Sequence, residues 1–153
     1  MYLFADIFKS LILYFELCFE QFLAKSGLLK VSFLTDGKVS SIGEQQELVL
    51  FRILQEALNN SLKHSRAKHF KISLQYHHDL LNLSLEDDGI GFSPGLLNSK
   101  SGSGLRNMEN RAALIGGKAT IESAPGQGCR IKITLNSFKQ LYTDGGPHPN
   151  SFS

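Results

Sequence analysis

Apolar residues recur at steps of three and four along three stretches of the chain, a spacing typical of amphipathic helices. The clearest stretch runs from about Gly43 to His64, and neither glycine nor proline occurs in it after Gly43. A shorter one runs from Leu105 to Ile115 and is followed by two glycines, a common helix stop. The third, Met1 to Leu23, has an apolar stripe wider than one face, which suits packing on its own domain or contact with a partner.

Five further segments alternate apolar with polar residues, as strands do when one face of a sheet is buried. Two of them flank the polar turn His77-His78-Asp79, and two others flank Pro125-Gly126-Gln127-Gly128. Short turns of this composition predict hairpins. The predicted strands are Leu28 to Leu34, Phe70 to Tyr76, Leu80 to Leu85, Ala119 to Ser123 and Cys129 to Leu135.

The length of 153 residues, 42% of them hydrophobic, predicts one domain with a substantial core. We expect residues 27–138 to form this domain. Residues 1–26 are expected to be an N-terminal helix, either a linker or the first helix of the domain. Residues 139–153 include Gly145-Gly146-Pro147 and little to bury, so they are expected to form a disordered tail.

Composition excludes several classes of protein. Charged residues such as Asp6 and Glu16 interrupt the N-terminal stretch, so we expect neither a membrane segment nor a signal peptide. The net charge of +2 is dispersed, so nucleic acid is not an expected partner. Cys18 and Cys129 are far apart and in no metal-binding spacing, which favours a reducing, cytoplasmic location over a zinc site or disulfide framework.

An acidic and glycine-rich run, Glu86 to Phe92, directly follows the third predicted strand. In the spacing Asp87-x-Gly89-x-Gly91, the carboxylate can accept a hydrogen bond from an exocyclic amine. The glycines let the backbone turn sharply and let a flat ring approach closely. The run therefore suits purine binding, although a plain surface turn has the same composition.

The clearest predicted helix carries polar residues at i, i+4, i+7 and i+8, a spacing that predicts one common face. Such a row is either a ligand-binding stripe or the solvated face of the helix, and the row alone leaves both interpretations open. Its members are Glu56, Asn60, Lys63 and His64.

Three motifs, in order, resemble those of the GHKL ATP-binding superfamily, the group of gyrase, the Hsp90 chaperones, mismatch-repair ATPases and histidine kinases. The segment ILQEALNNSLKHS, which ends at Ser65, resembles its N box, DDGIGF its G1 box, and GSGLRNMENRAALIGG from Gly102 its G2 box. Together with SAPGQGCRIKITL, these are most similar to the catalytic and ATP-binding domain of sensor histidine kinases that pair with LuxR-type response regulators. The resemblance covers roughly Leu28 to Leu135.

The resemblance implies a Bergerat-type ATP-binding fold of the α/β (α+β) class. This is a two-layer sandwich in which helices cover one face of a mixed, mainly antiparallel sheet. The implied ligands are ATP and Mg²⁺. The stretch from Ser93 to Gly104 has several glycines and few large apolar residues, so we expect a mobile loop, with Ser93 to Ser103 as an ATP lid.

The matched positions on the N box imply site roles. Asn60 matches the magnesium-binding asparagine of the family, whose side-chain oxygen suits a hard cation. Glu56 matches the residue that acts as general base in hydrolysing members, so Glu56 and Asn60 are the expected catalytic pair. Lys63 and His64 would then lie near the phosphates.

The matched positions on the glycine boxes imply the rest of the ATP site. Asp87 matches the aspartate that accepts the adenine N6 amine, whereas Asp88 stands where asparagine is usual and is expected to be peripheral. Gly89 and Gly91 would let the strand end fold under the nucleotide.

The start of the G2 helix would bind phosphate through its backbone. Gly102, Gly104 and Leu105 would direct N–H groups towards the anion, as helix N-termini do.

Cys129 departs from the family pattern, which usually has threonine there. The missing hydroxyl is expected to weaken nucleotide binding about fivefold.

The resemblance implies a histidine kinase that transfers the γ-phosphate of ATP. The first histidine of the chain is His64, so the accepting histidine is expected on a missing or separate phosphotransfer and dimerisation domain, with a response regulator as an indirect partner. The location is expected to be cytoplasmic, alone or as part of a membrane-bound sensor. Two alternatives stay open, a serine kinase of the anti-sigma-factor type and a non-catalytic nucleotide-binding regulatory module.

Overall fold

The computed structural model describes residues 29–37 and 42–136. The helix expected for residues 1–26 and the tail expected for residues 139–153 lie outside these described residues. Among the described residues, no helix is both long and apolar enough to cross a lipid bilayer.

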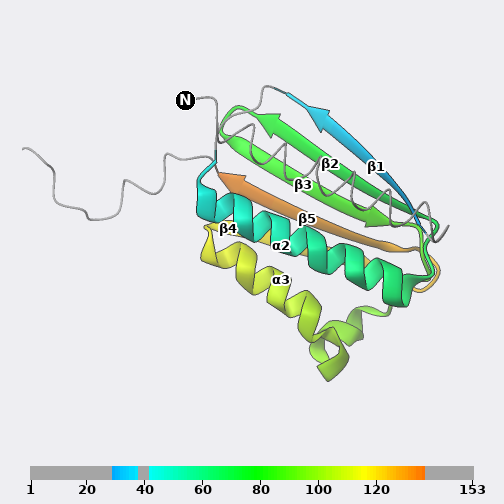
Figure 1. Cartoon of the computed structure of the whole chain (residues 1–153). Helices are drawn as coiled ribbons and strands as arrows, with labels where there is room; N and C mark the ends of the chain where they lie inside the picture. Colours follow the sequence, from blue (N-terminus) through cyan, green and yellow to red (C-terminus); the bar gives the residue numbers. More distant parts are fainter. Residues whose placement is uncertain (1–28, 38–41, 137–153) are drawn as a thin grey trace, which may run out of the picture.

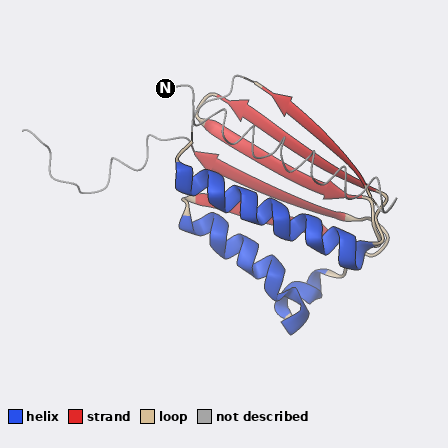
Figure 2. Ribbon diagram, in the orientation of Figure 1, coloured by secondary structure: helices blue, strands red, loops and turns tan. Residues whose placement is uncertain are grey.

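The described part of the chain folds into two layers, a five-stranded sheet and a layer of helices (Figure 1). The strand order is β1-β2-β3-β5-β4; β1 and β2 are parallel and the other neighbours antiparallel. Helices α2 and α3 cover the same face of the sheet (Figure 2). The predicted mixed, mainly antiparallel sandwich is therefore confirmed. The main elements are β1 Lys30–Asp36, α2 Glu44–Asn60, β2 His69–His77, β3 Leu80–Asp87, α3 Ser103–Leu114, β4 Gly117–Ser123 and β5 Cys129–Asn136.

The core lies between the sheet and the helices because the strands alternate. In β3, Leu81, Leu83 and Leu85 are almost fully buried, while the residues between them are partly exposed. On α3, Met108 and Ala112 are buried one turn apart. Each fully buried leucine contributes about 1.5–3 kcal/mol relative to an exposed one. The largest fully buried side chains are Leu50, Ile53, Leu54, Leu58, Leu74, Leu81, Leu83, Leu85, Met108 and Ile133.

The first strand runs over Lys30–Asp36 rather than the predicted Leu28 to Leu34. Val31 and Phe33 still pack against the core, as the alternation predicted. The strand extends further because its parallel register on β2 continues as far as Asp36. Gly37 follows with a φ of 87°, a left-handed conformation that suits glycine.

The clearest predicted helix changes its winding near its C-terminus. Helix α2 ends at Asn60, and Ser61–Ser65 form one π-helical turn. In this turn the Ser65 hydroxyl donates to the Ser61 carbonyl over 2.6 Å. A π turn is wider than an α turn, so the residues after Asn60 lie at different angles around the axis from those that an α-helix predicts.

Residues 93–102, here named the lid segment, belong to the stretch for which a mobile loop and an ATP lid were predicted. They form two short 3₁₀ helices, Pro94–Asn98 and Lys100–Gly102. Leu97 packs against the core, and Leu96 lines the cavity described below.

One carboxyl group is buried in the first turn of α2. Glu47 is 3% exposed, and its Oε1 has no hydrogen-bond partner among the described residues. Burial, with a smaller contribution from the charge of Glu44, raises the pKa of Glu47 from 4.5 to about 7. Burial and then the charge of Glu47 raise the pKa of Tyr76 to about 12. The folded domain therefore favours the protonated form of Glu47.

We expect ionisation of Glu47 to destabilise the folded domain. Because folding raises this pKa from 4.5 to about 7, the native state binds the proton more tightly, and stability falls as pH rises across that window. Relative to wild type, Glu47→Gln should gain up to about 3 kcal/mol in unfolding free energy between about pH 4 and about pH 8. Urea unfolding at both pH values measures the difference.

The matched control is Glu109→Gln, because Glu109 is an exposed carboxylate on α3. This variant should follow the wild-type pH profile. Parallel profiles for Glu47→Gln and wild type would contradict the prediction.

Candidate functional site

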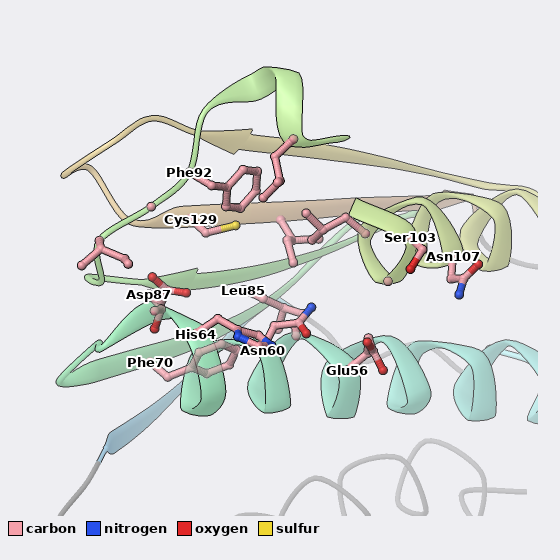
Figure 3. Close-up of a pocket in the computed structure, with 18 residues that line it drawn as sticks. Glu56, Asn60, His64, Phe70, Leu85, Asp87, Phe92, Ser103, Asn107 and Cys129 are labelled. Carbon is pink, nitrogen blue, oxygen red and sulfur yellow. The ribbon is translucent and has the colours of Figure 1, made fainter. Parts of the chain in front are cut away.

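A cavity of about 720 Å³ lies between α2, the start of α3 and the adjoining ends of β3 and β5 (Figure 3). This volume is within the range of small-molecule sites. Polar side chains enter it from α2, α3 and β3, over a largely apolar wall. The lining residues are Glu56, Ala57, Asn60, His64, Ser65, Phe70, Leu85, Asp87, Ile90, Gly91, Phe92, Leu96, Ser103, Gly104, Leu105, Asn107, Cys129 and Ile131.

Asp87, the last residue of β3, lies at one end of the cavity. Its Oδ1 accepts a hydrogen bond from the Gly89 N–H over 3.0 Å, which orients the carboxylate. No described residue donates to Oδ2, so this oxygen is available to a ligand amine. Asp87 pairs with Cys129 across β3 and β5. Burial and then the charge of Asp87 raise the pKa of Cys129 to about 12, so the thiol beside the carboxylate stays protonated at neutral pH.

The turn after β3 lies against the end of the π-helical turn. The Ile90 N–H donates to the Ser65 carbonyl over 2.7 Å. A Cβ atom at Gly89 would lie 2.3 Å from that same carbonyl oxygen and 2.6 Å from the Ser65 Cβ. Only glycine permits this approach, which fixes the position of Asp87 relative to the helix that carries Asn60.

The same turn is held on its other side by the β4–β5 connection. The Gly126 N–H donates to the Ile90 carbonyl over 2.6 Å, and the Phe92 N–H donates to the Ser123 hydroxyl oxygen over 2.9 Å. Gly91 has a φ of 62°, and a Cβ there would lie 2.1 Å from the Ala124 carbonyl oxygen. The turn that carries Ile90 and Gly91 at the cavity is thus fixed by hydrogen bonds on both sides.

Helix α2 supplies a polar side of the cavity through Glu56 and Asn60, and the π-helical turn that follows it adds His64 (Figure 3). Lys63 is exposed and does not line the cavity. The expected common face therefore holds for three of the four residues. The wider π turn accounts for the difference, since it keeps His64 near the line of Asn60 and leaves Lys63 to one side.

The first turn of α3 lies close to these α2 side chains. A Cβ at Gly104 would lie 2.9 Å from Glu56 Oε1 and 3.9 Å from Asn60 Nδ2. The carboxylate, the amide and the N-terminus of α3 therefore meet in one part of the cavity. A helix N-terminus favours negative charge, so this part suits an anionic group.

Asp88 lies outside the cavity, as expected from its peripheral assignment. Its Oδ1 accepts the N–H groups of Lys68 and His69 over 2.8 and 2.9 Å, and its Oδ2 lies 2.7 Å from His69 Nδ1. The hydrogen bonds from the His69 backbone and then from the His69 side chain lower the pKa of Asp88 to about 2; desolvation opposes them, and the Lys68 N–H adds a smaller lowering effect. Asp88 thus joins the start of β2 to the end of β3.

Seven of the residues predicted from sequence meet at this cavity, and three do not line it. Lys63, Gly89 and Gly102 are the three outside it. The seven are Glu56, Asn60, His64, Asp87, Gly91, Gly104 and Leu105.

Sequence reasoning missed the apolar wall and two polar residues of α3. Phe70, Leu85 and Ile131 line the wall and are core positions of alternating strands, so nothing in the pattern separates them from other core residues. Ser103 and Asn107 lie four residues apart on α3, and both side chains are at the cavity (Figure 3). Their i, i+4 spacing beside Gly104 is the signal that could have revealed them.

Comparison with protein families gives one matching model. Residues 45–138 match the family described as histidine kinase-, DNA gyrase B-, and HSP90-like ATPase.

Among curated proteins, the chain is similar to sensor histidine kinases. The chain is 36% identical over 104 residues to an uncharacterized sensor-like histidine kinase of Chloroflexus aurantiacus, an overlap of 65% of this chain and 17% of that protein. It is 36% identical over 101 residues to the sensor histidine kinase LiaS of Bacillus subtilis, an overlap of 66% of this chain and 28% of LiaS. The chain therefore spans less than a third of the length of either relative.

Comparison with solved structures gives the same fold. The full-length ShkA structure, in complex with AMPPNP, matches with a TM-score of 0.68 and 19% sequence identity, over 87% of this chain and 31% of that one. At 19% sequence identity, the similarity to this structure shows only that the helices and strands have the same arrangement.

We expect Gly89→Ala to destabilise the domain and to disturb the cavity, because the added Cβ would meet the backbone of Ser65 at 2.3 Å. The expected loss is about 1–3 kcal/mol of unfolding free energy, measured by urea unfolding. Gly95→Ala is the matched control, since nothing lies within 4 Å of a Cβ at Gly95. Equal stability of the two variants would contradict the proposed close approach.

Proposed function

Because the chain belongs to the family of histidine kinase-, DNA gyrase B- and HSP90-like ATPases, we propose that its cavity binds ATP with Mg²⁺ for phosphoryl transfer to a histidine of another domain. The likeness to sensor histidine kinases, expected from three motifs, is confirmed by the relatives. The single observation that carries the proposed binding mode is that Asp87 and Asn60 line one cavity at separate positions (Figure 3).

Asp87 is proposed to select adenine. Its free Oδ2 would accept the N6 amine of the base, whereas guanine presents an oxygen at that position and would meet the carboxylate acceptor to acceptor. The apolar side chains of Phe70, Leu85 and Ile131 offer a dry wall for the ring. The orientation by Gly89 limits the entropy that the carboxylate loses on binding.

The phosphates are proposed to lie where α2 and α3 approach each other. The first turn of α3, with Gly104 and Leu105 at the cavity, offers backbone N–H groups and a favourable helix dipole. Gly102 contributes less directly than its motif suggested, because its N–H donates to the Ser99 carbonyl over 3.1 Å. His64 and Lys63 remain proposed as nearby positive or polar groups.

Asn60 is proposed to hold Mg²⁺ through its side-chain oxygen. Among the described residues, no group of three or more His, Cys, Asp or Glu could hold a metal ion on its own. One amide beside a carboxylate nevertheless fits an ion that takes most of its ligands from phosphate and water. When bound, Mg²⁺ would neutralise charge on the transferred phosphoryl group.

Glu56 is proposed to act as a base that polarises the accepting group, since its carboxylate lies beside Gly104 at the phosphate part of the cavity. The accepting histidine is proposed to belong to a dimerisation domain, as the curated relatives are much longer than this chain. A response regulator would receive the phosphoryl group from that histidine. We propose that the domain works in the cytoplasm, where ATP is supplied.

Calorimetric titration with a non-hydrolysable ATP analogue and Mg²⁺ tests the binding site. Asp87→Asn should weaken binding about 10- to 100-fold, because it removes a charged hydrogen-bond acceptor. Asn60→Ala should abolish the Mg²⁺-dependent part of the affinity and leave metal-free binding nearly unchanged. Asp88→Asn is the matched control, since this neighbouring carboxylate faces β2, and it should bind as wild type. Wild-type affinity in both Asp87→Asn and Asn60→Ala would reject the assignment.

Phosphoryl transfer to the acceptor-histidine domain of a relative such as LiaS tests the role of Glu56. With radiolabelled ATP, Glu56→Gln should slow transfer about 100-fold or more, because the accepting histidine loses the base that activates it. Binding of the analogue should stay near wild type, because Glu56 is not proposed to bind the nucleotide. Wild-type domain that binds the analogue but labels no histidine domain would instead favour a regulatory nucleotide-binding module. Labelling of serine would favour the serine kinase alternative.

A further inference from the structure

The guanidinium group of Arg106 joins α3 to the lid segment. Its Nη1 donates to the Leu97 carbonyl over 2.7 Å and to the Ser99 carbonyl over 3.0 Å. A charged donor makes stronger hydrogen bonds to carbonyl oxygens than a neutral one. Because both acceptors belong to the backbone, the attachment fixes the path of the lid segment itself.

The lid segment also folds on itself. The N–H and the hydroxyl of Ser99 both donate to the Leu96 carbonyl, over 3.0 and 2.7 Å. The Gly102 N–H returns to the Ser99 carbonyl, and a Cβ at Gly102 would lie 2.2 Å from the Leu96 carbonyl oxygen. The segment is therefore a compact unit that Arg106 holds against α3.

This unit forms part of the cavity wall. Leu96 lines the cavity, and the neighbouring Leu97 packs against the core. Gly104 and Leu105, the two residues that directly precede Arg106 on α3, line the same cavity. A displacement of the lid segment would therefore change the space between Leu96 and the first turn of α3.

The position of Arg106 is not explained by the stability of α3 alone. A cation near the N-terminus of a helix is disfavoured by the helix dipole, and cations are favoured near the C-terminus, where Arg111 lies. The two carbonyls of the lid segment supply the compensating negative partners for Arg106.

We propose that Arg106 is a positioning residue that holds the lid segment over the cavity and so sets how slowly bound ATP dissociates. This inference rests on the proposed function, because it takes the ligand of the cavity to be ATP. Arg106 acts through the lid segment and touches neither the base nor the Mg²⁺ ligand Asn60.

The test compares wild type with Arg106→Met, which keeps an apolar stem and removes the donors. Hydrogen exchange without nucleotide should show faster exchange across residues 96–103 and unchanged exchange in β2, β3 and β5. Stopped-flow release of a fluorescent ATP analogue should become about tenfold faster, while transfer at saturating ATP changes little. Arg106→Lys, which restores a donor without the planar fork, should give intermediate values in both measurements.

The control is Arg111→Met on the same helix, which removes an equal charge and should match wild type in both measurements. Unchanged exchange of the lid segment together with unchanged analogue release in Arg106→Met would overturn the inference. Faster exchange throughout the sheet would overturn it as well, because Arg106 would then support the whole fold. Failure of the wild type to bind the analogue would reject the proposed function, whereas the exchange data separately decide whether Arg106 holds the lid segment.

Discussion

The close approach of Gly89 to Ser65 determines the geometry of the candidate site. It joins the end of β3, which carries Asp87, to the π-helical turn that continues α2, which carries Asn60. A side chain at residue 89 would meet the backbone and side chain of Ser65 and force the two elements apart. The positions of the Asp87 carboxylate and the Asn60 amide relative to each other therefore depend on one glycine backbone and one carbonyl oxygen.

The π-helical turn is the second part of this arrangement. Ser65 uses its hydroxyl to bond the Ser61 carbonyl while its own carbonyl receives the Ile90 N–H. The widened turn thus presents a carbonyl sideways to the glycine turn, and it also leaves Lys63 out of the cavity. Such turns occur at functional sites because they redirect side chains and backbone groups within an otherwise regular helix.

Two adjacent carboxylates illustrate how environment assigns different roles to the same chemical group. Asp88 is satisfied by two backbone N–H groups and the His69 ring, and its role is to hold two strand ends together. The Asp87 carboxylate accepts one hydrogen bond among the described residues, from the Gly89 N–H, and Asp87 lines the cavity. The difference lies in which elements surround each carboxylate. The sequence DDGIGF by itself is compatible with either role for either aspartate.

The sequence alone predicted the main helices and strands, because periodicity records which face is buried. Its three motifs, through the family resemblance that they carry, predicted the two-layer fold and most of the polar residues that line the cavity. It could not separate Phe70 or Ile131 from ordinary core residues, since lining a cavity leaves no mark on strand alternation. Nor could it place Lys63 outside the row of Glu56, Asn60 and His64, or detect that Arg106 bonds the lid segment. Those outcomes depend on hydrogen bonds between groups that come together only when α2, α3 and the sheet pack, and tertiary structure therefore decided them.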